Sequence, residues 1–357
     1  MKIGMITFHN AFNIGANLQA YALNKYINEN IGDCEIIDFI PNNRVVQQSK
    51  FKKCLHLIKA AISFPLKGKE KKFKIFQKKY KISNRQFNGD NDIFANPPRY
   101  DILISGSDQA LNATLSGNSK SFYLGFYDNC KKISYASSFG RKEISDVETN
   151  LIKSQLIKFS AISVREQSGA DIIKEIIGKD AQLVLDPVFL LSADEWRTLS
   201  TKSKLPDKYI FVYLMECSYE MLNVIEQVRQ EYKLPIIVAY GVCGAIDNVI
   251  EAKNCGPKDF IYYLDNAELV VTNSFHGTAF SIILEKDFIC VAHSKRNERL
   301  ANIMDLCKEA DKLILKQPKS DIKNNVVLGA NANKYISEHI KRSKDYLNIN
   351  CKLNEGE

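Results

Sequence analysis

The chain has few of the residues that build metal centres or disulfide frameworks. Its nine cysteines are scattered, odd in number and never arranged as C-x-x-C, and its five histidines are dispersed. This distribution disfavours a zinc site and a disulfide framework, and it favours a reducing compartment. We therefore expect no metal and no cofactor.

Long apolar runs are missing as well. No window approaches the roughly 18 uninterrupted apolar residues of a membrane-spanning helix. The start, Met1–Met5, leads into polar His9 and Asn10 without the apolar core of a signal peptide. G-x-S-x-G, P-loop, kinase and G-x-G-x-x-G motifs are also absent from the sequence. These absences favour a cytoplasmic protein outside the common serine-hydrolase, nucleotide-triphosphatase and kinase classes.

Positive charge is concentrated in one segment. The net charge is +8, but residues 44–85 hold fourteen Lys or Arg residues and one acid, Glu70, so this segment carries +13. An apolar stripe from Phe51 to Ile62 lies within it, which is the composition of a helix on an anionic membrane surface. The alternative is a solvated lid whose stripe packs on the first domain. Nucleic acid is disfavoured, because no matching motif accompanies the charge.

The 357 residues, 45% of them apolar, are enough for two compact α/β domains. Apolar strand-like runs alternate with helical periodicity, which predicts βαβ units and parallel sheets. Pro187, Pro206 and the polar run 200–203 mark the boundary. We predict two Rossmann-like domains with a GT-B-like arrangement and a cleft between them. The expected divisions are 1–195 with the basic insertion 44–85, 205–325, and a helical tail at 330–357. The expected strands lie at 2–8, 35–39, 101–105, 132–136, 161–164, 182–185, 209–215, 235–239, 268–272 and 288–292.

Ligands of open parallel sheets bind at the carboxyl ends of strands, so residues just past strand ends are the first candidates. The strongest segment is Thr272–Thr278, which follows an apolar strand and opens a helix that Asn273 or Ser274 can cap. His276 then lies in the first turn, where the helix dipole suits a neutral base near an anion. Gly277 allows the close approach of a ligand or of another backbone. The alternative is a capped helix with a packed histidine.

Two further strand ends carry candidates. Arg165 ends a short strand beside Glu166, and its planar fork suits a carboxylate or phosphate. A structural ion pair with Glu166 or another acid is the alternative. Amides and a glycine between Asn13 and Gln19 lie at a helix N-terminus, which is a natural site for an anion or a sugar hydroxyl. The turn Gly106–Gln109 is a weaker candidate, and His9 fits either a structural or a functional role.

Six segments in this order resemble the polysaccharide pyruvyl transferase family, and the likeness covers roughly residues 1–315. They are Ile14–Leu23, Ser105–Gln109, Ile133–Gly140, Ser163–Glu166, Leu185–Pro187 and Thr272–Ser281. The resemblance implies a GT-B-like transferase that moves a pyruvyl group from phosphoenolpyruvate to a pair of sugar hydroxyls as a cyclic ketal. It also implies a role in bacterial capsule, exopolysaccharide or cell-wall glycan synthesis, on an acceptor that can be lipid-linked at the inner membrane face.

The resemblance makes His276 the essential histidine and Arg165 an arginine that grips the donor. Many members have Arg-Leu-His-Gly where this chain has Ser274–Gly277, so a second donor-binding arginine is missing from its usual place. We expect Arg296 to supply the charge first and Arg141 second, with Arg299 as a further candidate. The expected substrate-binding residues are Asn13, Gly15, Asn17, Gln19, Ser107, Asp108, Gln109, Ser138, Arg141, Asn273, Ser274, Phe275, Gly277 and Arg296.

Two other functions fit the same sequence. One is a GT-B glycosyltransferase that uses a nucleotide sugar, which the lack of an obvious acidic ribose-binding residue in the second domain disfavours. The other is a non-catalytic sugar-binding protein that has kept the fold. We also expect His276 and Arg165 to face each other across the cleft, although 111 residues separate them.

Overall fold

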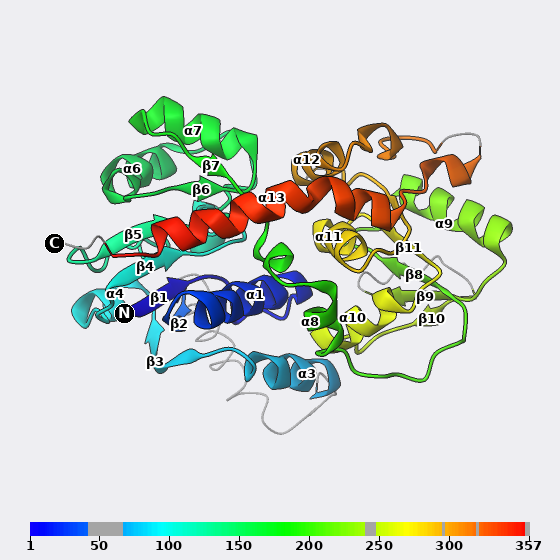
Figure 1. The fold of residues 1–357 in the computed structure, drawn as a ribbon, viewed down its shortest axis with the longest axis horizontal. Coiled ribbons are helices and arrows are strands. Elements are labelled where there is room, and N and C mark those ends of the chain that lie inside the picture. The colour runs from blue at the N-terminus through cyan, green and yellow to red at the C-terminus, as the bar shows by residue number, and fades with distance from the viewer. Residues whose placement is uncertain (42–66, 240–247, 295–296, 319–320, 354–357) are drawn as a thin grey trace, which may run out of the picture. The chain divides into compact units, whose positions relative to one another are not determined.

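The structure, a computed structural model, describes residues 1–41, 67–239, 248–294, 297–318 and 321–353. Its contacts divide the chain into two compact units (Figure 1). Unit 1 comprises Met1–Leu190 and Lys341–Glu357, and unit 2 comprises Leu191–Ile340. The apolar stripe that was predicted between Phe51 and Ile62 lies outside the described residues.

Unit 1 is built on a parallel sheet of five strands in the order β3-β2-β1-β4-β5. A second, two-stranded parallel sheet pairs β6 with β7. The strands are β1 (Lys2–Ile6), β2 (Asp33–Ile40), β3 (Ile82–Asn88), β4 (Ile102–Ser105), β5 (Lys131–Ser134), β6 (Ser163–Val164) and β7 (Gln182–Leu183). The helices are α1 (Ile14–Asn30), α3 (Lys67–Gln77), α4 (Asp90–Ala95), α5 (Ala113–Ser116), α6 (Asp146–Ser154), η1 (Leu156–Lys158), α7 (Gln167–Ile177) and η2 (Pro187–Leu190).

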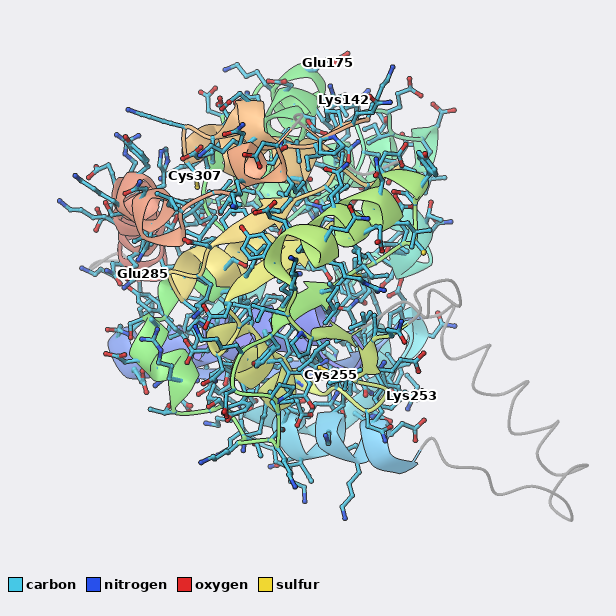
Figure 2. The ribbon with its side chains drawn as sticks, turned by 90° about the vertical axis from the view of Figure 1, so that its right-hand side faces the viewer. Lys142, Glu175, Lys253, Cys255, Glu285 and Cys307 are labelled. Carbon is cyan, nitrogen blue, oxygen red and sulfur yellow. The ribbon has the colours of Figure 1, made fainter. Side chains whose placement is uncertain are left out.

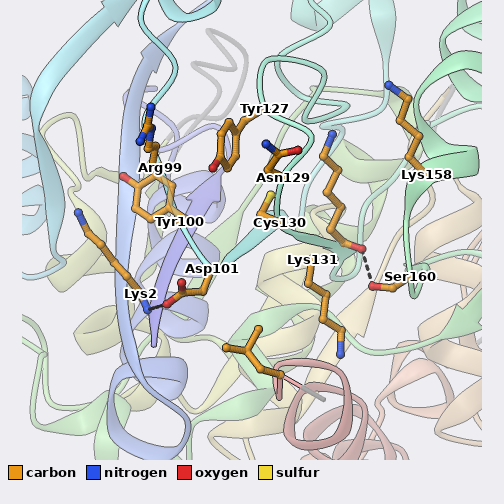
Figure 3. Close-up of a pocket in the computed structure, with 12 residues that line it drawn as sticks. Lys2, Arg99, Tyr100, Asp101, Tyr127, Asn129, Cys130, Lys131, Lys158 and Ser160 are labelled. Carbon is orange, nitrogen blue, oxygen red and sulfur yellow. Dashed lines mark hydrogen bonds between the residues drawn. The ribbon is translucent and has the colours of Figure 1, made fainter. Parts of the chain in front are cut away.

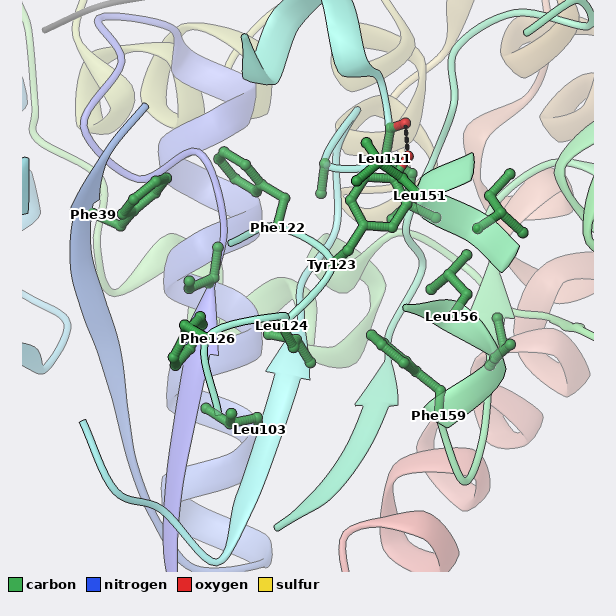
Figure 4. Packing of buried hydrophobic residues seen from close by; sticks show 14 of the residues in the cluster. Phe39, Leu103, Leu111, Phe122, Tyr123, Leu124, Phe126, Leu151, Leu156 and Phe159 are labelled. Atoms are coloured by element: carbon green, nitrogen blue, oxygen red, sulfur yellow. Dashed lines mark hydrogen bonds between the residues drawn. The ribbon is translucent and has the colours of Figure 1, made fainter. Parts of the chain in front are cut away.

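The core of unit 1 is rich in aromatic side chains (Figure 4). The Phe122 ring centroid lies 4.7 Å from that of Phe8 and 5.7 Å from that of Phe39. Such pairs contribute about 0.5–1.5 kcal/mol beyond the area they bury. β4 is buried at every residue, because helices and loops cover both faces of a central parallel strand. The core therefore fixes the centre of the sheet, from which the loops of the candidate site emerge.

The end of the basic segment belongs to the fold of unit 1. Phe73 and Phe76 on α3 are fully buried, and the Phe76 ring centroid lies 5.5 Å from that of Tyr21 on α1. Residues 82–85 then begin β3, an edge strand. We predicted no strand here, and that expectation was wrong, because the polar sequence of β3 buries only Phe87 and shows no clear alternation.

Unit 2 repeats the same strand order with a second parallel sheet, β10-β9-β8-β11-β12. In both sheets the order reverses direction beside the first strand, so the switch points lie between β1 and β4 and between β8 and β11. The strands are β8 (Ile210–Tyr213), β9 (Ile236–Ala239), β10 (Ile250–Glu251), β11 (Leu269–Thr272) and β12 (Phe288–Cys290). The helices are α8 (Ala193–Arg197), α9 (Tyr219–Tyr232), α10 (Pro257–Asp265), α11 (Phe275–Ile283), α12 (Glu298–Leu306), η3 (Ala310–Lys312) and η4 (Ile322–Asn325).

The long helix α13 (Gly329–Asn350) is shared between the units, with Gly329–Ile340 in unit 2 and Lys341–Asn350 in unit 1. In unit 2 the Asn333 side chain near its start donates a 2.8 Å hydrogen bond to Glu285, which is labelled in Figure 2. In unit 1 the Tyr346 hydroxyl donates to the backbone oxygen of Ser134 at 2.9 Å. Each half of the helix is therefore held by polar contacts within its own unit.

Most described cysteines are free thiols, including buried Cys255 and Cys307 (Figure 2). Cys217, which follows β8, is disulfide-bonded. Within the described ranges, no helix is both long and apolar enough to cross a membrane. The same residues hold no group of three or more His, Cys, Asp or Glu side chains suited to a metal ion.

Candidate active site

The loop after β1 and the first turn of α1 form one side of the switch point in unit 1. The Asn13 side chain caps α1 by accepting a hydrogen bond from the Ala16 N–H at 3.0 Å. Asn17 and Gln19 are fully buried and use their amide groups within the protein. The Asn17 amide donates to Asn13 O at 2.8 Å, and the Gln19 amide donates to Thr7 Oγ1 at 2.9 Å. Of the predicted amides, Asn13 is the one that is only partly buried.

The buried His9 ring lies beside this loop with both nitrogens close to oxygen acceptors. Its Nε2 lies 3.1 Å from Asp38 Oδ1, and its Nδ1 lies 3.2 Å from the Thr7 carbonyl oxygen. Burial raises the pKa of Asp38, but hydrogen bonds from His9 and Gln86 outweigh it and leave that pKa below its usual value. His9 therefore holds the ends of β1 and β2 together.

Two non-glycine residues with left-handed backbone follow β4 and β5. Asp108 has φ 70° and Ala136 has φ 50°. Such conformations cost of order 1–3 kcal/mol each and persist only where the surroundings impose them. Here the Ser137 hydroxyl donates to the Gly106 carbonyl at 2.9 Å, and the Ser138 N–H donates to the Asp108 carbonyl at 3.0 Å. The two turns are therefore tied together beside the switch point, where strain is often functional.

Arg165 connects these turns to the strand ends beyond them. Its side chain is 2% exposed, and its Nη1 lies 2.6 Å from Asp186 Oδ2. Its Nη2 lies 3.5 Å from Asp108 Oδ1, and its Nε lies 3.8 Å from Glu166 Oε2. Burial lowers the pKa of Arg165, but the attraction of these three carboxylates outweighs it and raises that pKa above its usual value. The guanidinium is thus directed at internal acids of unit 1.

Hydroxyl groups complete this cluster around Arg165. Ser107 Oγ donates to Asp186 Oδ2 at 3.3 Å, and Ser138 Oγ donates to Glu166 Oε1. The Gly140 N–H also donates to Glu166 Oε1 at 3.3 Å. The predicted residues Ser107, Asp108, Ser138 and Arg165 are therefore brought together.

Arg141, a candidate for the missing donor-binding arginine, is engaged by Glu148. Its Nη2 lies 2.5 Å from both carboxylate oxygens of Glu148, which is fully buried. Burial raises the pKa of Glu148, but hydrogen bonds from Arg141, Ser145 and Ala113 outweigh it and lower that pKa. Nearby Gln109 is buried and accepts a 3.1 Å hydrogen bond from Asn112. These side chains therefore stabilise the loops of unit 1.

In unit 2 the predicted segment after β11 forms the start of α11. Ser274 is the N-cap residue and His276 is the second residue of the helix, where it is half-buried. The Asn273 side chain accepts from the Met215 N–H at 2.7 Å and donates to the Glu216 carbonyl at 2.8 Å. Asn273 thereby ties the ends of β8 and β11 together at the switch point. His276 lies where the helix N-terminus favours negative charge.

An aromatic ring lies beside His276, and an arginine lies over that ring. The ring centroid of Phe275 lies 5.3 Å from that of His276, with the two planes at 86°. The Arg299 guanidinium, in the first turn of α12, lies over the Phe275 ring at 5.7 Å from its centroid. Arg296, the first choice for the missing charge, lies outside the described residues. Arg299 is therefore the described arginine candidate at this edge of the sheet.

Gly277 is required by close packing against Thr272. A Cβ at residue 277 would lie 2.2 Å from Thr272 Oγ1, which donates to the Tyr213 carbonyl at 2.6 Å. We expect Gly277→Ala to lower the free energy of unfolding by about 1–3 kcal/mol through overpacking. The control is Gly169→Ala in α7, where the nearest atom lies 3.4 Å away and a loss of this size is not expected. Urea unfolding measures both, and equal stability of the two variants would contradict this packing argument.

A second polar group at this edge was not predicted from the sequence. Glu216, which follows β8, lies with Oε1 3.3 Å from His293 Nδ1, and its Oε2 accepts a 2.8 Å hydrogen bond from the Ser294 hydroxyl. His293 and Ser294 follow β12. Both residues lie just past a strand end, which is the signal that could have identified them. Nothing in the sequence links His293 to Glu216, 77 residues earlier. The pair gives unit 2 a second acid–base group.

One known protein family has a sequence profile that matches this chain. The sequence profile of polysaccharide pyruvyl transferases matches residues 13–295, which is most of the chain and includes both Arg165 and His276. This chain belongs to the polysaccharide pyruvyl transferase family. Membership makes it a transferase of polysaccharide biosynthesis. No curated protein matches it significantly by sequence.

Several solved structures resemble this chain in fold. A putative UDP-N-acetylglucosamine 2-epimerase from Listeria monocytogenes has a TM-score of 0.51 at 12% identity, covering 98% of this chain and 90% of the other. The Methanocaldococcus jannaschii UDP-GlcNAc 2-epimerase scores 0.48 at 14% identity and covers 95% and 99%. The E. coli heptosyltransferase WaaC scores 0.40 at 10% identity and covers 95% and 100%. The first of these likenesses confirms the predicted GT-B-like α/β fold with two Rossmann-like units.

Proposed function

We propose that this family member transfers the pyruvyl group of phosphoenolpyruvate to two hydroxyls of one sugar, forming a cyclic ketal with release of phosphate. The observation that carries the proposal is the position of His276. It lies in the first turn of α11, directly after β11, next to the switch point of its sheet. A histidine there can exchange protons with an anionic donor in the field of the helix N-terminus.

The chemistry needs one proton donor and proton acceptors for two hydroxyls. Protonation of the donor's methylene carbon creates an oxocarbenium-like centre at C2, and one sugar hydroxyl attacks it and loses its proton. The second hydroxyl then forms the second C–O bond as the C–O bond to phosphate breaks, and its proton leaves with the phosphate. We assign the first proton transfer to His276. The Glu216–His293 pair, 3.3 Å apart, is suited to accept a hydroxyl proton.

The anionic groups of the donor need cationic partners. A phosphate monoester carries about −1.5 to −2 charges at pH 7, to which the donor adds a carboxylate. Arg141 is engaged by Glu148 and Arg165 by three acids, so we propose Arg299 as the arginine that replaces the one missing at Ser274. Arg165 acts in this proposal as a positioning residue. It holds together the turns of unit 1 that carry Ser107, Asp108 and Ser138.

A comparison of ligands tests the donor. We expect phosphoenolpyruvate to raise the unfolding temperature, because a ligand at 100 times its Kd stabilises a protein by about 2.7 kcal/mol. Phosphate release from phosphoenolpyruvate should then require an added oligosaccharide, and a panel that presents different hydroxyl pairs identifies the acceptor. A rise with UDP-N-acetylglucosamine and none with phosphoenolpyruvate would instead favour a nucleotide-sugar glycosyltransferase. Binding of sugar alone, without turnover, would favour a non-catalytic protein.

A further inference from the structure

The loop that joins β8 to α9 exposes two large apolar side chains at the carboxyl edge of unit 2. Met215 is 45% exposed, and Tyr219, the first residue of α9, is 77% exposed. Such side chains need no explanation when they are scattered singly over a surface. These two share one loop, and β8 borders the switch point, where open parallel sheets bind ligands. The loop is therefore placed to contact a ligand.

Met215 is fixed beside the residues to which proton transfers are assigned. Its backbone N–H donates to Asn273 Oδ1 at 2.7 Å, and Asn273 leads into the first turn of α11, which carries His276. The Asn273 amide also donates to the Glu216 carbonyl at 2.8 Å, and the Glu216 carboxylate accepts from the Ser294 hydroxyl at 2.8 Å. The backbone around Met215 is thus held from two neighbouring strand ends, while its side chain remains partly in solvent.

An exposed thioether at this position suits a sugar better than it suits the anionic donor. A phosphate and a carboxylate lose water without compensation when they are placed against an apolar side chain. A pyranose ring presents C–H bonds on its face and hydroxyls at its rim. Ligand sites meet this combination with apolar side chains and a few convergent polar groups. Met215 supplies the apolar side chain, which adapts its shape readily, and the Glu216–His293 pair supplies the polar groups.

We propose that Met215 is a specificity-determining residue for the sugar acceptor. Its side chain packs on the C–H face of the sugar whose hydroxyl reaches the Glu216–His293 pair. The inference rests on the proposed function, because it takes that pair as the group that accepts the hydroxyl proton. A packing contact of this kind binds the ground state and the transition state equally, so it acts on the KM for the acceptor and not on kcat.

The methionines of the chain allow a footprint with an internal control. Met215 and Met1 are each 45% exposed, so hydrogen peroxide should convert both to the sulfoxide. The other methionines are fully buried and should react more slowly: Met5, Met221 and Met304. Met1 precedes Lys2, which lines a hollow at the amino ends of the unit 1 strands (Figure 3). Met1 therefore reports on the other unit and on the opposite edge of a sheet.

The probes are the methyl glycosides of galactose, glucose, mannose and N-acetylglucosamine, added to the full-length protein without donor. At twice its Kd, a glycoside that covers Met215 should slow the oxidation of Met215 by about threefold, because only the free protein reacts. The rate at Met1 should not change, and mass spectrometry of the peptides measures both. Equal protection of both methionines, or no protection of Met215 by any of the four glycosides, would overturn the proposal. Protection by phosphoenolpyruvate alone would place the donor at Met215 and would overturn it as well.

Steady-state kinetics provide the second measurement. Met215→Ala should raise the KM for the sugar acceptor by about threefold to tenfold and leave kcat unchanged, because an apolar contact is lost. The control is Leu328→Ala in the same unit. Leu328 is 47% exposed and follows Val327, which pairs with Phe288 at the start of β12, so it lies at the amino edge of the sheet. This variant should leave both constants unchanged.

The two measurements separate the failure of this inference from the failure of the proposed function. If phosphoenolpyruvate supports no turnover, the proposed function fails, and the footprint alone decides whether a sugar covers Met215. If turnover occurs, a fall in kcat with no change in KM for Met215→Ala would overturn the inference. Equal kinetic effects of Met215→Ala and Leu328→Ala would also overturn it and would leave the proposed reaction intact.

Discussion

Replacing His276 with alanine is expected to lower ketal formation by about 10²–10⁴-fold, the usual loss when a general acid or base is removed. The fold should survive, because the side chain is only half-buried and α11 is held by its own backbone hydrogen bonds and by the packing of Gly277 on Thr272. The measurement is the initial rate of phosphate release from phosphoenolpyruvate at saturating acceptor, together with the thermal unfolding temperature.

A histidine away from the strand ends serves as the control for this prediction. His339→Ala alters a half-buried histidine in α13 and should leave the rate unchanged. His276→Gln keeps a neutral hydrogen-bonding side chain, so a rate as low as that of the alanine variant would indicate proton transfer rather than hydrogen bonding. An effect of His276→Ala smaller than about threefold would remove His276 from the mechanism.

Replacing Arg165 with methionine is expected to lower the free energy of unfolding by about 3–5 kcal/mol. The substitution keeps most of the volume but leaves Asp186, Asp108 and Glu166 without their shared cation, and a buried charge that loses its partner is strongly destabilising. Urea unfolding followed by circular dichroism measures the loss. Activity should fall as well, since the strained turns that carry Asp108 and Ser138 lose the group that ties them.

The control is the exposed pair of Arg85 and Asp92 in the same unit, which are 2.7 Å apart with side chains 50% and 29% exposed. Arg85→Met should cost no more than about 1 kcal/mol, the usual range for surface ion pairs. Adding Asp186→Asn to Arg165→Met should recover part of the lost stability, because one unpaired carboxylate is then removed. Equal losses for Arg165→Met and Arg85→Met would show that the buried cluster does not stabilise unit 1.

The alternation of apolar strands and helices was enough to predict the central parts of both sheets. β4 and β11 are short apolar runs buried at every residue, so composition and length identify them. β3 and β10 escaped prediction for a physical reason: both are edge strands, and the side chains of Ile250 and Glu251 in β10 are both exposed. Such strands are held by backbone pairing with a neighbour, which leaves little trace in the sequence.

The sequence predicted individual residues of the candidate site, but it did not predict the contacts between them. The position of His276 at the start of α11 follows from the apolar run before it. The glycine at position 277 was expected to mark a close approach of other atoms, and Thr272 makes that approach. The engagement of Arg165 by Asp186 could not be predicted, because the partners are 21 residues apart on different loops. The pairing of Glu216 with His293 depends in the same way on neighbouring strands that the sequence alone does not align.

The repeated strand order of the two units is the pattern that a gene duplication would leave. Duplication of an ancestral half-chain would produce two sheets with the same strand order. After a duplication, core packing constrains the strands of both copies, whereas their loops are free to diverge. The carboxyl edges differ here, because an arginine–carboxylate cluster around Arg165 lies in one unit and a histidine at a helix N-terminus, His276, lies in the other. New acceptor specificities can therefore arise by exchange of loops alone, without any change to the strands that support them.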